Sequence, residues 1–193
     1  MALFIAGLVI FLGIHSTRIF AEGWRAERIR RMGEKPWKGV YSIVSIASFV
    51  VMVWGYRYAR HDPTVLWTSP GWTRDVTALL TLPAFVLLVA AYVPGTRMKA
   101  ALGHPMLAAT VLWAAGHLLS NGQIADVLLF GGFLVWAVAD FATSRARDRK
   151  TGVTYPALGL SRDVIAAVVG VVAFVLFAMY LHRVLIGVQP FGT

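Results

Sequence analysis

Long apolar segments alternate with short polar or basic stretches along the whole chain. Each apolar segment is close to the roughly 20 residues that an α-helix needs to cross the hydrocarbon core of a bilayer. Backbone groups inside lipid must be hydrogen-bonded within their own segment, so each segment is predicted to be a helix. The six segments cover residues 2–20, 40–58, 76–93, 99–120, 124–142 and 164–184.

This pattern predicts an all-α integral membrane protein, a bundle of about six transmembrane helices that forms a single domain over residues 1–193. The composition agrees, because 58% of the residues are hydrophobic and only 14% are charged, whereas a soluble domain has about 25% charged residues. The chain has no cysteine. Disulfides, zinc–thiolate sites, iron–sulfur clusters and cysteine nucleophiles are therefore excluded.

Basic residues are concentrated on alternate connections between the apolar segments. Fourteen of the 18 Lys and Arg residues lie around the first, third and fifth connections, and the other four are Arg57, Arg60, Arg74 and Arg183. Since basic loops stay in the cytoplasm, both termini are predicted on the non-cytoplasmic side. The net charge of +9 is interpreted as orientation in, and attraction to, an anionic bilayer, and a nucleic-acid partner is not expected.

The first connection mixes acidic and basic residues at helical spacing over residues 22–31. Two interpretations are open: a short amphipathic helix at the membrane interface, with Trp24 and Trp37 as anchors, or a solvated basic loop. Further along, Pro83 is expected to kink the third segment. The Asn121–Gly122 step predicts a tight hairpin between the fourth and fifth segments.

Three histidines lie within apolar segments: His15 in the first, and His104 and His117 in the fourth. Such residues are costly in lipid and usually face a partner, a cavity or a ligand. Counted along the predicted helices, His15 and His104 lie about 6 Å and about 9 Å to the cytoplasmic side of the midplane, and His117 about 10 Å to the outer side. Two imidazoles at one depth on different helices could hold a haem iron, although hydrogen bonding between helices is the commoner role.

Other catalytic arrangements are not apparent. Asp126 and Asp140 are interpreted as helix-start and helix-end residues near the headgroups. Ser16 follows His15 directly, so the two side chains diverge on a helix and form no nucleophile–base pair. There is no phosphate-binding glycine loop, and catalytic residues cannot be assigned.

Four ordered blocks carry a family resemblance: LGIHSTRIFAEGWR at residues 12–25, GEKPWKGVYSIVSIASFVVMVWGY at 33–56, HPMLAATVLWAAGHLLSNG at 104–122 and ADVLLFGGFLVWAVAD at 125–140. They resemble the NnrU family of bacterial membrane proteins, which is named for genes linked to denitrification and nitric oxide metabolism. The family is also similar to the plant zeta-carotene isomerase, a membrane enzyme that holds haem b through histidines and isomerises a central cis double bond.

The resemblance implies a protein of the bacterial inner membrane that binds haem b. It makes His15, His104 and His117 the candidate cofactor ligands, and the depth argument favours His15 and His104 as the pair on the iron. The implied role is in nitrogen-oxide metabolism or in cis–trans isomerisation of a carotene-like polyene. The implied partners are respiratory membrane enzymes or a hydrophobic polyene. With no cysteine in the chain, a thiolate ligand cannot replace a histidine.

Two alternatives remain open at this point. The protein could be a non-enzymatic assembly factor for respiratory enzymes, with the basic region 18–38 docking the partner. His104-Pro105 also resembles the His-Pro motif of the isoprenylcysteine methyltransferase and sterol reductase group. However, Gly103 stands where that group usually has Arg, and no second cofactor motif follows near the C-terminus.

Overall fold

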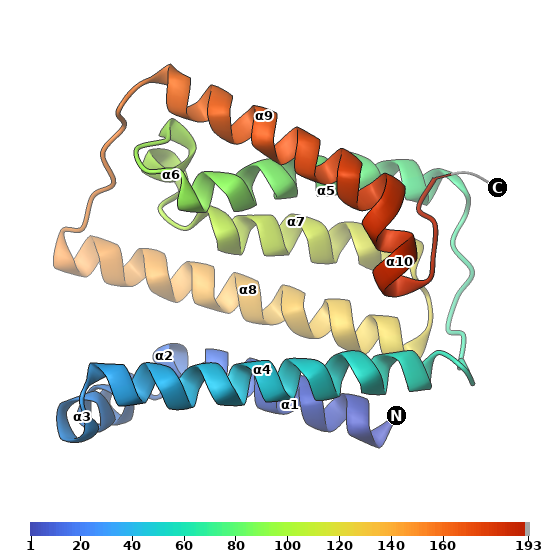
Figure 1. Ribbon diagram of the computed structural model, residues 1–193, viewed down its shortest axis with the longest axis horizontal. Coiled ribbons are helices and arrows are strands. Elements are labelled where there is room, and N and C mark those ends of the chain that lie inside the picture. Colours follow the sequence, from blue (N-terminus) through green and yellow to red (C-terminus); the bar gives the residue numbers. More distant parts are fainter. Residues whose placement is uncertain (192–193) are drawn as a thin grey trace.

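The computed structural model describes residues 1–191, which are helical throughout apart from turns, loops and one isolated bridge between Val65 and Gln123. Long helices lie side by side along the longest axis (Figure 1). They are α1 (Ala2–His15), α4 (Glu34–Ala59), α5 (Trp72–Tyr92), α7 (Pro105–Ser120), α8 (Ile124–Thr151) and α9 (Leu160–Leu176). The shorter elements are α2 (Thr17–Phe20), α3 (Glu22–Met32), α6 (Arg97–Leu102), the π-helical turn η1 (Phe177–Leu181) and α10 (His182–Ile186).

The described residues contain four helices that are long and apolar enough to cross a membrane: α4, α5, α8 and the continuous helix Leu160–Ile186. Helices α1 and α7 are apolar but have only 14 and 16 residues. At about 1.5 Å per residue they span about 21 Å and about 24 Å, less than the roughly 30 Å hydrocarbon core. An all-helical protein with membrane-spanning helices is therefore confirmed, and the count of six spans stays a prediction.

Glycines allow two pairs of helices to approach closely. Helix α1 packs against α4, where a Cβ atom on Gly7 would lie 2.4 Å from the backbone nitrogen of Met52, and one on Gly55 would lie 2.4 Å from that of Phe4. On the other side of the molecule α9 packs on α5, where a Cβ on Gly170 would lie 2.6 Å from the Cα of Val86. Helix α8 contacts both α1 and α7 and so joins these two parts.

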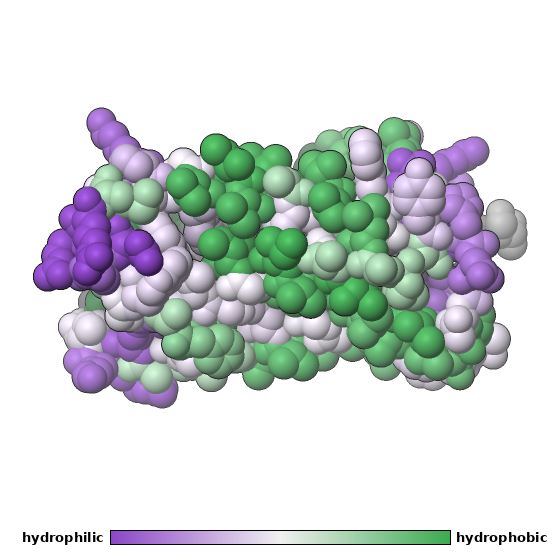
Figure 2. Space-filling view, turned by 90° about the horizontal axis from the view of Figure 1, so that it is seen from below, coloured by the Kyte–Doolittle hydropathy of each residue, from purple (hydrophilic) through white to green (hydrophobic). Residues whose placement is uncertain are grey.

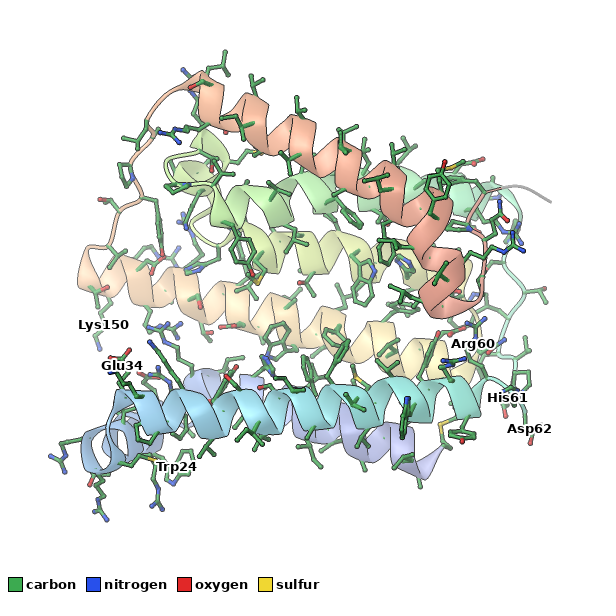
Figure 3. The ribbon with its side chains drawn as sticks, viewed as in Figure 1. Trp24, Glu34, Arg60, His61, Asp62 and Lys150 are labelled. Carbon is green, nitrogen blue, oxygen red and sulfur yellow. The ribbon has the colours of Figure 1, made fainter. Side chains whose placement is uncertain are left out.

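The surface between the two ends of the molecule is predominantly apolar, and polar side chains gather at the ends (Figure 2). One end holds α3, α6 and the last turns of α8, with Trp24, Glu34 and Lys150 (Figure 3). The opposite end holds α10, Arg60 and His61. The end with α3 is called the basic end below, because the fourteen clustered Lys and Arg residues lie on the elements that meet there.

The predicted helix over residues 99–120 is wrong, because the chain breaks between α6 and α7. Gly103 has a φ of +73°, a left-handed conformation that ends α6. His104 then caps α7, and Pro105 is its first residue, where the missing N–H costs nothing. His104 is therefore not inside a continuous helix but at the start of one.

The first connection is helical, since α3 covers Glu22–Met32 and so contains the predicted amphipathic segment. Glu22 and Glu27 form ion pairs with arginines of the same helix. Trp24 is about half exposed and packs on Trp37, which is only 7% exposed. Trp37 is thus part of the protein interior and not the membrane anchor that the sequence suggested.

The hairpin predicted at Asn121–Gly122 is present between α7 and α8. The loop that follows α4 is tied to it, because the backbone N–H of Leu66 donates to the carbonyl of Gly122 at 2.8 Å. Pro83 lies inside α5, which continues without interruption to Tyr92.

Candidate functional site

His15 occupies the last position of α1 and lies among aromatic side chains from three helices. Its ring packs on Phe11 of the same helix, with 4.2 Å between ring centroids. Tyr41 of α4 and Trp136 of α8 approach it edge-on, at 5.4 Å and 6.0 Å. The imidazole is half-buried in the interior between α1, α4 and α8.

His117 has a similar environment near the end of α7. Its ring packs on Trp113 at 5.3 Å and on Phe130 of α8 at 4.8 Å. It is also half-buried. Both histidines therefore sit against aromatic residues of α8.

The two imidazoles have the same hydrogen-bond arrangement. The Nδ1 of His15 lies 2.7 Å from the carbonyl oxygen of Phe11, and that of His117 lies 2.8 Å from the carbonyl oxygen of Trp113. Because a carbonyl only accepts, Nδ1 carries the proton in each ring and Nε2 carries the lone pair. Neither Nε2 has a hydrogen-bond partner within residues 1–191. This is the tautomer that a histidine needs to bind a metal through Nε2.

A continuous series of ring contacts connects these two histidines. Phe133 of α8 is the central ring, 5.7 Å from both Phe11 and Trp113. Phe11 leads to His15, and Trp113 leads to His117. We call the seven residues Phe11, His15, Trp113, His117, Phe130, Phe133 and Trp136 the aromatic cluster.

One buried polar atom close to His15 has no hydrogen-bond partner among the described residues. It is the indole Nε1 of Trp136, whose ring contacts the imidazole. A buried polar group without a partner costs about 1–3 kcal/mol. Such groups in a native protein commonly mark the place of a ligand or an ordered water.

His104 lies elsewhere. Its Nε2 is 2.9 Å from a carboxylate oxygen of Asp148, which also accepts a hydrogen bond from the hydroxyl of Tyr155 at 3.1 Å. The His104 and Asp148 side chains are only 24% and 14% exposed. The Nε2 of His104 is thus already used, in a polar network at the basic end.

The contacts along α8 place the three histidines at different depths. His117 touches Phe130, His15 touches Trp136 and His104 bonds to Asp148. At about 1.5 Å per residue, Trp136 is about 9 Å from Phe130 and about 18 Å from Asp148 along the helix axis. The expectation that His15 and His104 share a depth is therefore wrong, because His104 precedes α7 and reaches the last turns of α8.

The other aspartates and histidines that the sequence drew attention to form hydrogen bonds within the protein or are exposed. Asp126 is the third residue of α8, forms a capping box with Gln123 and accepts a hydrogen bond from Tyr56. Asp140 accepts one from Ser144. His61 is exposed beyond α4, and the Nδ1–H of His182 donates to the carbonyl of Val188. The interpretation of Asp126 as a helix-start residue is confirmed.

Sequence reasoning missed four residues near the histidines: Tyr41, Trp136, Asp148 and Tyr155. Asp148 had a visible signal, because it is the one acid within the basic stretch at residues 145–150. An isolated acid among arginines is expected to have a specific partner. Trp136 had no such signal, since a tryptophan in an apolar segment usually serves packing or an interface.

No group of three or more His, Cys, Asp or Glu side chains that could hold a metal ion is found within the described residues. A haem needs only one or two protein ligands, and the His15 and His117 imidazoles have the donor chemistry for that group.

Comparison with known proteins gives one family. The family model described as NnrU protein matches residues 3–190. No curated protein and no solved structure matches the sequence. Since the match covers nearly the whole chain, this protein belongs to the NnrU family.

Proposed function

We propose that this protein binds haem b in the interior between α1, α7 and α8, with His15 and His117 as the ligands of the iron. The observation that carries the proposal is the shared arrangement of the two imidazoles. Each donates its Nδ1–H to the carbonyl four residues earlier, has an Nε2 without a partner among the described residues, and packs on an aromatic residue of α8. A hydrogen bond to the second ring nitrogen fixes the orientation of a ligating histidine and raises its basicity.

The surroundings of the two histidines support a flat apolar ligand. Phe11 and Trp113, which pack on the two imidazoles, offer ring faces and edges to such a group. The unpartnered Nε1 of Trp136 could donate to one of its polar substituents. Phe133 contacts both Phe11 and Trp113, so it has to move aside for one haem to reach both imidazoles.

A haem iron bound there would supply electron transfer or interaction with a small or unsaturated ligand. The chain itself would exclude water with the aromatic cluster and hold the iron through two neutral imidazoles. Together with the family resemblance, haem binding supports a role in nitrogen-oxide metabolism or in isomerisation of a carotene-like polyene at the bacterial inner membrane. The apolar exterior between the two ends supports access from the bilayer for a lipid-soluble substrate.

The test is an absorption spectrum of the purified protein in detergent, oxidised and then reduced with dithionite. We expect a sharp Soret band and split visible bands after reduction, as low-spin haem with two imidazole ligands requires. His15→Ala and His117→Ala should each remove the low-spin signal. His104→Ala and the exposed control His61→Ala should keep it.

Three results would argue against the proposal. A folded, colourless protein from haem-supplemented cells would rule out haem binding. Loss of the low-spin signal in His104→Ala with retention in His117→Ala would show that the sequence-based pair, and not this one, is correct. Retention in His15→Ala would remove the first ligand. Phe133→Leu provides a further check, since a smaller side chain there should preserve or increase haem content.

A further inference from the structure

A pocket of about 380 Å³ lies at the basic end, separate from the aromatic cluster. It is formed by α6, the last turns of α8 and the segment that follows α8. The side chains that line it include Arg145, Asp148, Arg149, Thr154 and Tyr155. It therefore combines two guanidinium groups with a carboxylate and two hydroxyls.

The carboxylate in this pocket does not pair with the arginines beside it. Asp148 lies three residues after Arg145, a spacing at which opposite charges on a helix ordinarily attract. Instead, one of its oxygens accepts hydrogen bonds from the Nε2–H of His104 and from the hydroxyl of Tyr155. Arg145 and Arg149 have no ion pair within residues 1–191.

The neighbouring acid Asp163, at the start of α9, has other partners. Its two carboxylate oxygens accept from the backbone N–H groups of Arg97 and Met98. Among the described residues, no carboxylate forms an ion pair with Arg145 or Arg149. The C-terminal end of α8 contributes about half a negative charge. Added to the single negative charge of Asp148, it does not balance the two positive charges of Arg145 and Arg149.

Arg145 and Arg149 differ in their exposure. Arg145 is half-buried beside Gly103, where an added Cβ would lie 2.8 Å from its Nη1. Arg149, one turn further on the same face of α8, is exposed. Two guanidinium groups on one wall of a pocket are suited to an anion with several oxygens, since guanidinium binds phosphate through paired hydrogen bonds.

We infer that this pocket binds a phosphate group, through Arg145 and Arg149, while His104 and Tyr155 keep Asp148 from occupying those arginines. The phosphate belongs to the headgroup of a membrane lipid or to a soluble phosphate compound. The elements that line the pocket lie at the basic end, next to the apolar helices, so both sources can reach it (Figure 1). This inference is independent of haem binding.

Two probes distinguish the sources with the full-length protein in detergent. Native mass spectrometry measures retention of phosphatidylglycerol against diacylglycerol with the same acyl chains. Calorimetric titration measures binding of inorganic phosphate in a chloride buffer. Retention of phosphatidylglycerol alone assigns the lipid headgroup, and binding of inorganic phosphate assigns a soluble source.

The decisive variant is Arg145→Gln/Arg149→Gln, which should weaken binding of either probe by roughly tenfold or more, because it removes charge-assisted hydrogen bonds. The matched control is Lys35→Gln/Lys150→Gln, which removes the same charge from the same end but no pocket side chain. It should stay within about twofold of the wild type, as screened surface charges do. The inference fails if folded wild-type protein binds neither probe, or if both double variants lose binding equally.

A second pair of variants tests the role of His104. In His104→Ala the carboxylate of Asp148 becomes available to Arg145, so phosphate binding should fall severalfold. His104→Ala/Asp148→Asn removes that competing charge and should restore it. A loss that the second substitution does not restore would overturn the assigned role, as would unchanged binding in His104→Ala. If His104→Ala does not fold, the same comparison is made with Tyr155→Phe and Tyr155→Phe/Asp148→Asn.

Discussion

Tyr56 of α4 donates a hydrogen bond to the carboxylate of Asp126, which is only 4% exposed at the start of α8. The same carboxylate accepts the backbone N–H of Gln123 and so completes the cap of α8. The ring of Tyr56 packs on Phe4 of α1 and lies under the guanidinium of Arg60. One polar contact thus links α8 to the pair formed by α1 and α4.

Removing the Tyr56 hydroxyl should loosen this link. Tyr56→Phe leaves a buried carboxylate with one partner fewer, and hydrogen bonds to charged groups contribute about 1.5–3 kcal/mol. We expect the free energy of unfolding to fall by about that amount, measured by denaturation in mixed micelles. Tyr58→Phe is the control, because Tyr58 is 70% exposed and its variant should match the wild type. Equal stability of the two variants would show that the contact contributes nothing.

The contact between α1 and α4 should not tolerate a side chain at its glycines. A methyl group at Gly7 or Gly55 would collide with the backbone of Met52 or Phe4. Gly7→Ala and Gly55→Ala should therefore each destabilise the protein by about 1–3 kcal/mol. The control is Gly13→Ala, on α1 like Gly7. A Cβ atom there would have no other atom within 4 Å, so this variant should be neutral or stabilising by up to about 1 kcal/mol. Thermal unfolding in detergent measures all three, and a neutral Gly7→Ala would contradict this packing.

Trp136 offers a way to detect a ligand without knowing its identity. In ligand-free protein, Trp136→Phe removes a buried N–H that has no partner within residues 1–191. Losing this N–H offsets part of the packing lost with the indole ring, so the free energy of unfolding should fall by no more than about 1 kcal/mol. In ligand-loaded protein the same variant should lower ligand retention. Trp54→Phe, at a position 62% exposed, is the control for retention. Ligand retention in Trp136→Phe equal to that in Trp54→Phe would show that the N–H of Trp136 does not bind the ligand.

Tyr155 should give the protein a stability that is lost at high pH. Burial, followed by its hydrogen bond to Asp148, raises the pKa of Tyr155 above the usual value of 10.0, against the opposing charges of Arg145 and Arg18. Since the folded pKa exceeds the unfolded one, this contribution is fully present below pH 10 and is lost as pH rises through the folded pKa. The difference in unfolding free energy between wild type and Tyr155→Phe should narrow above pH 10. A constant difference from pH 8 to pH 11 would contradict the linkage.

Much of the helical framework was predictable from local chemistry. Apolar stretches of about 20 residues require helices in lipid, and Asn121–Gly122 marks the hairpin between two of them. Asp126 was interpreted as a helix-start residue near the headgroups, and it is the third residue of α8, where its carboxylate accepts the backbone N–H of Gln123. The concentration of Lys and Arg at one end also follows from the sequence, since it depends only on counting loops.

The sequence by itself determined that the chain is a helical membrane protein of the NnrU family with histidines in its apolar segments. Only the tertiary structure decided which histidines share surroundings. A break at Gly103 moves His104 to the basic end, where Asp148 binds its Nε2. Side chains of α8 bring His15 and His117 to one aromatic cluster. Depth along one helix can be counted, but the relative shift of neighbouring helices depends on close packing at residues such as Gly7 and Gly55, which no local pattern specifies.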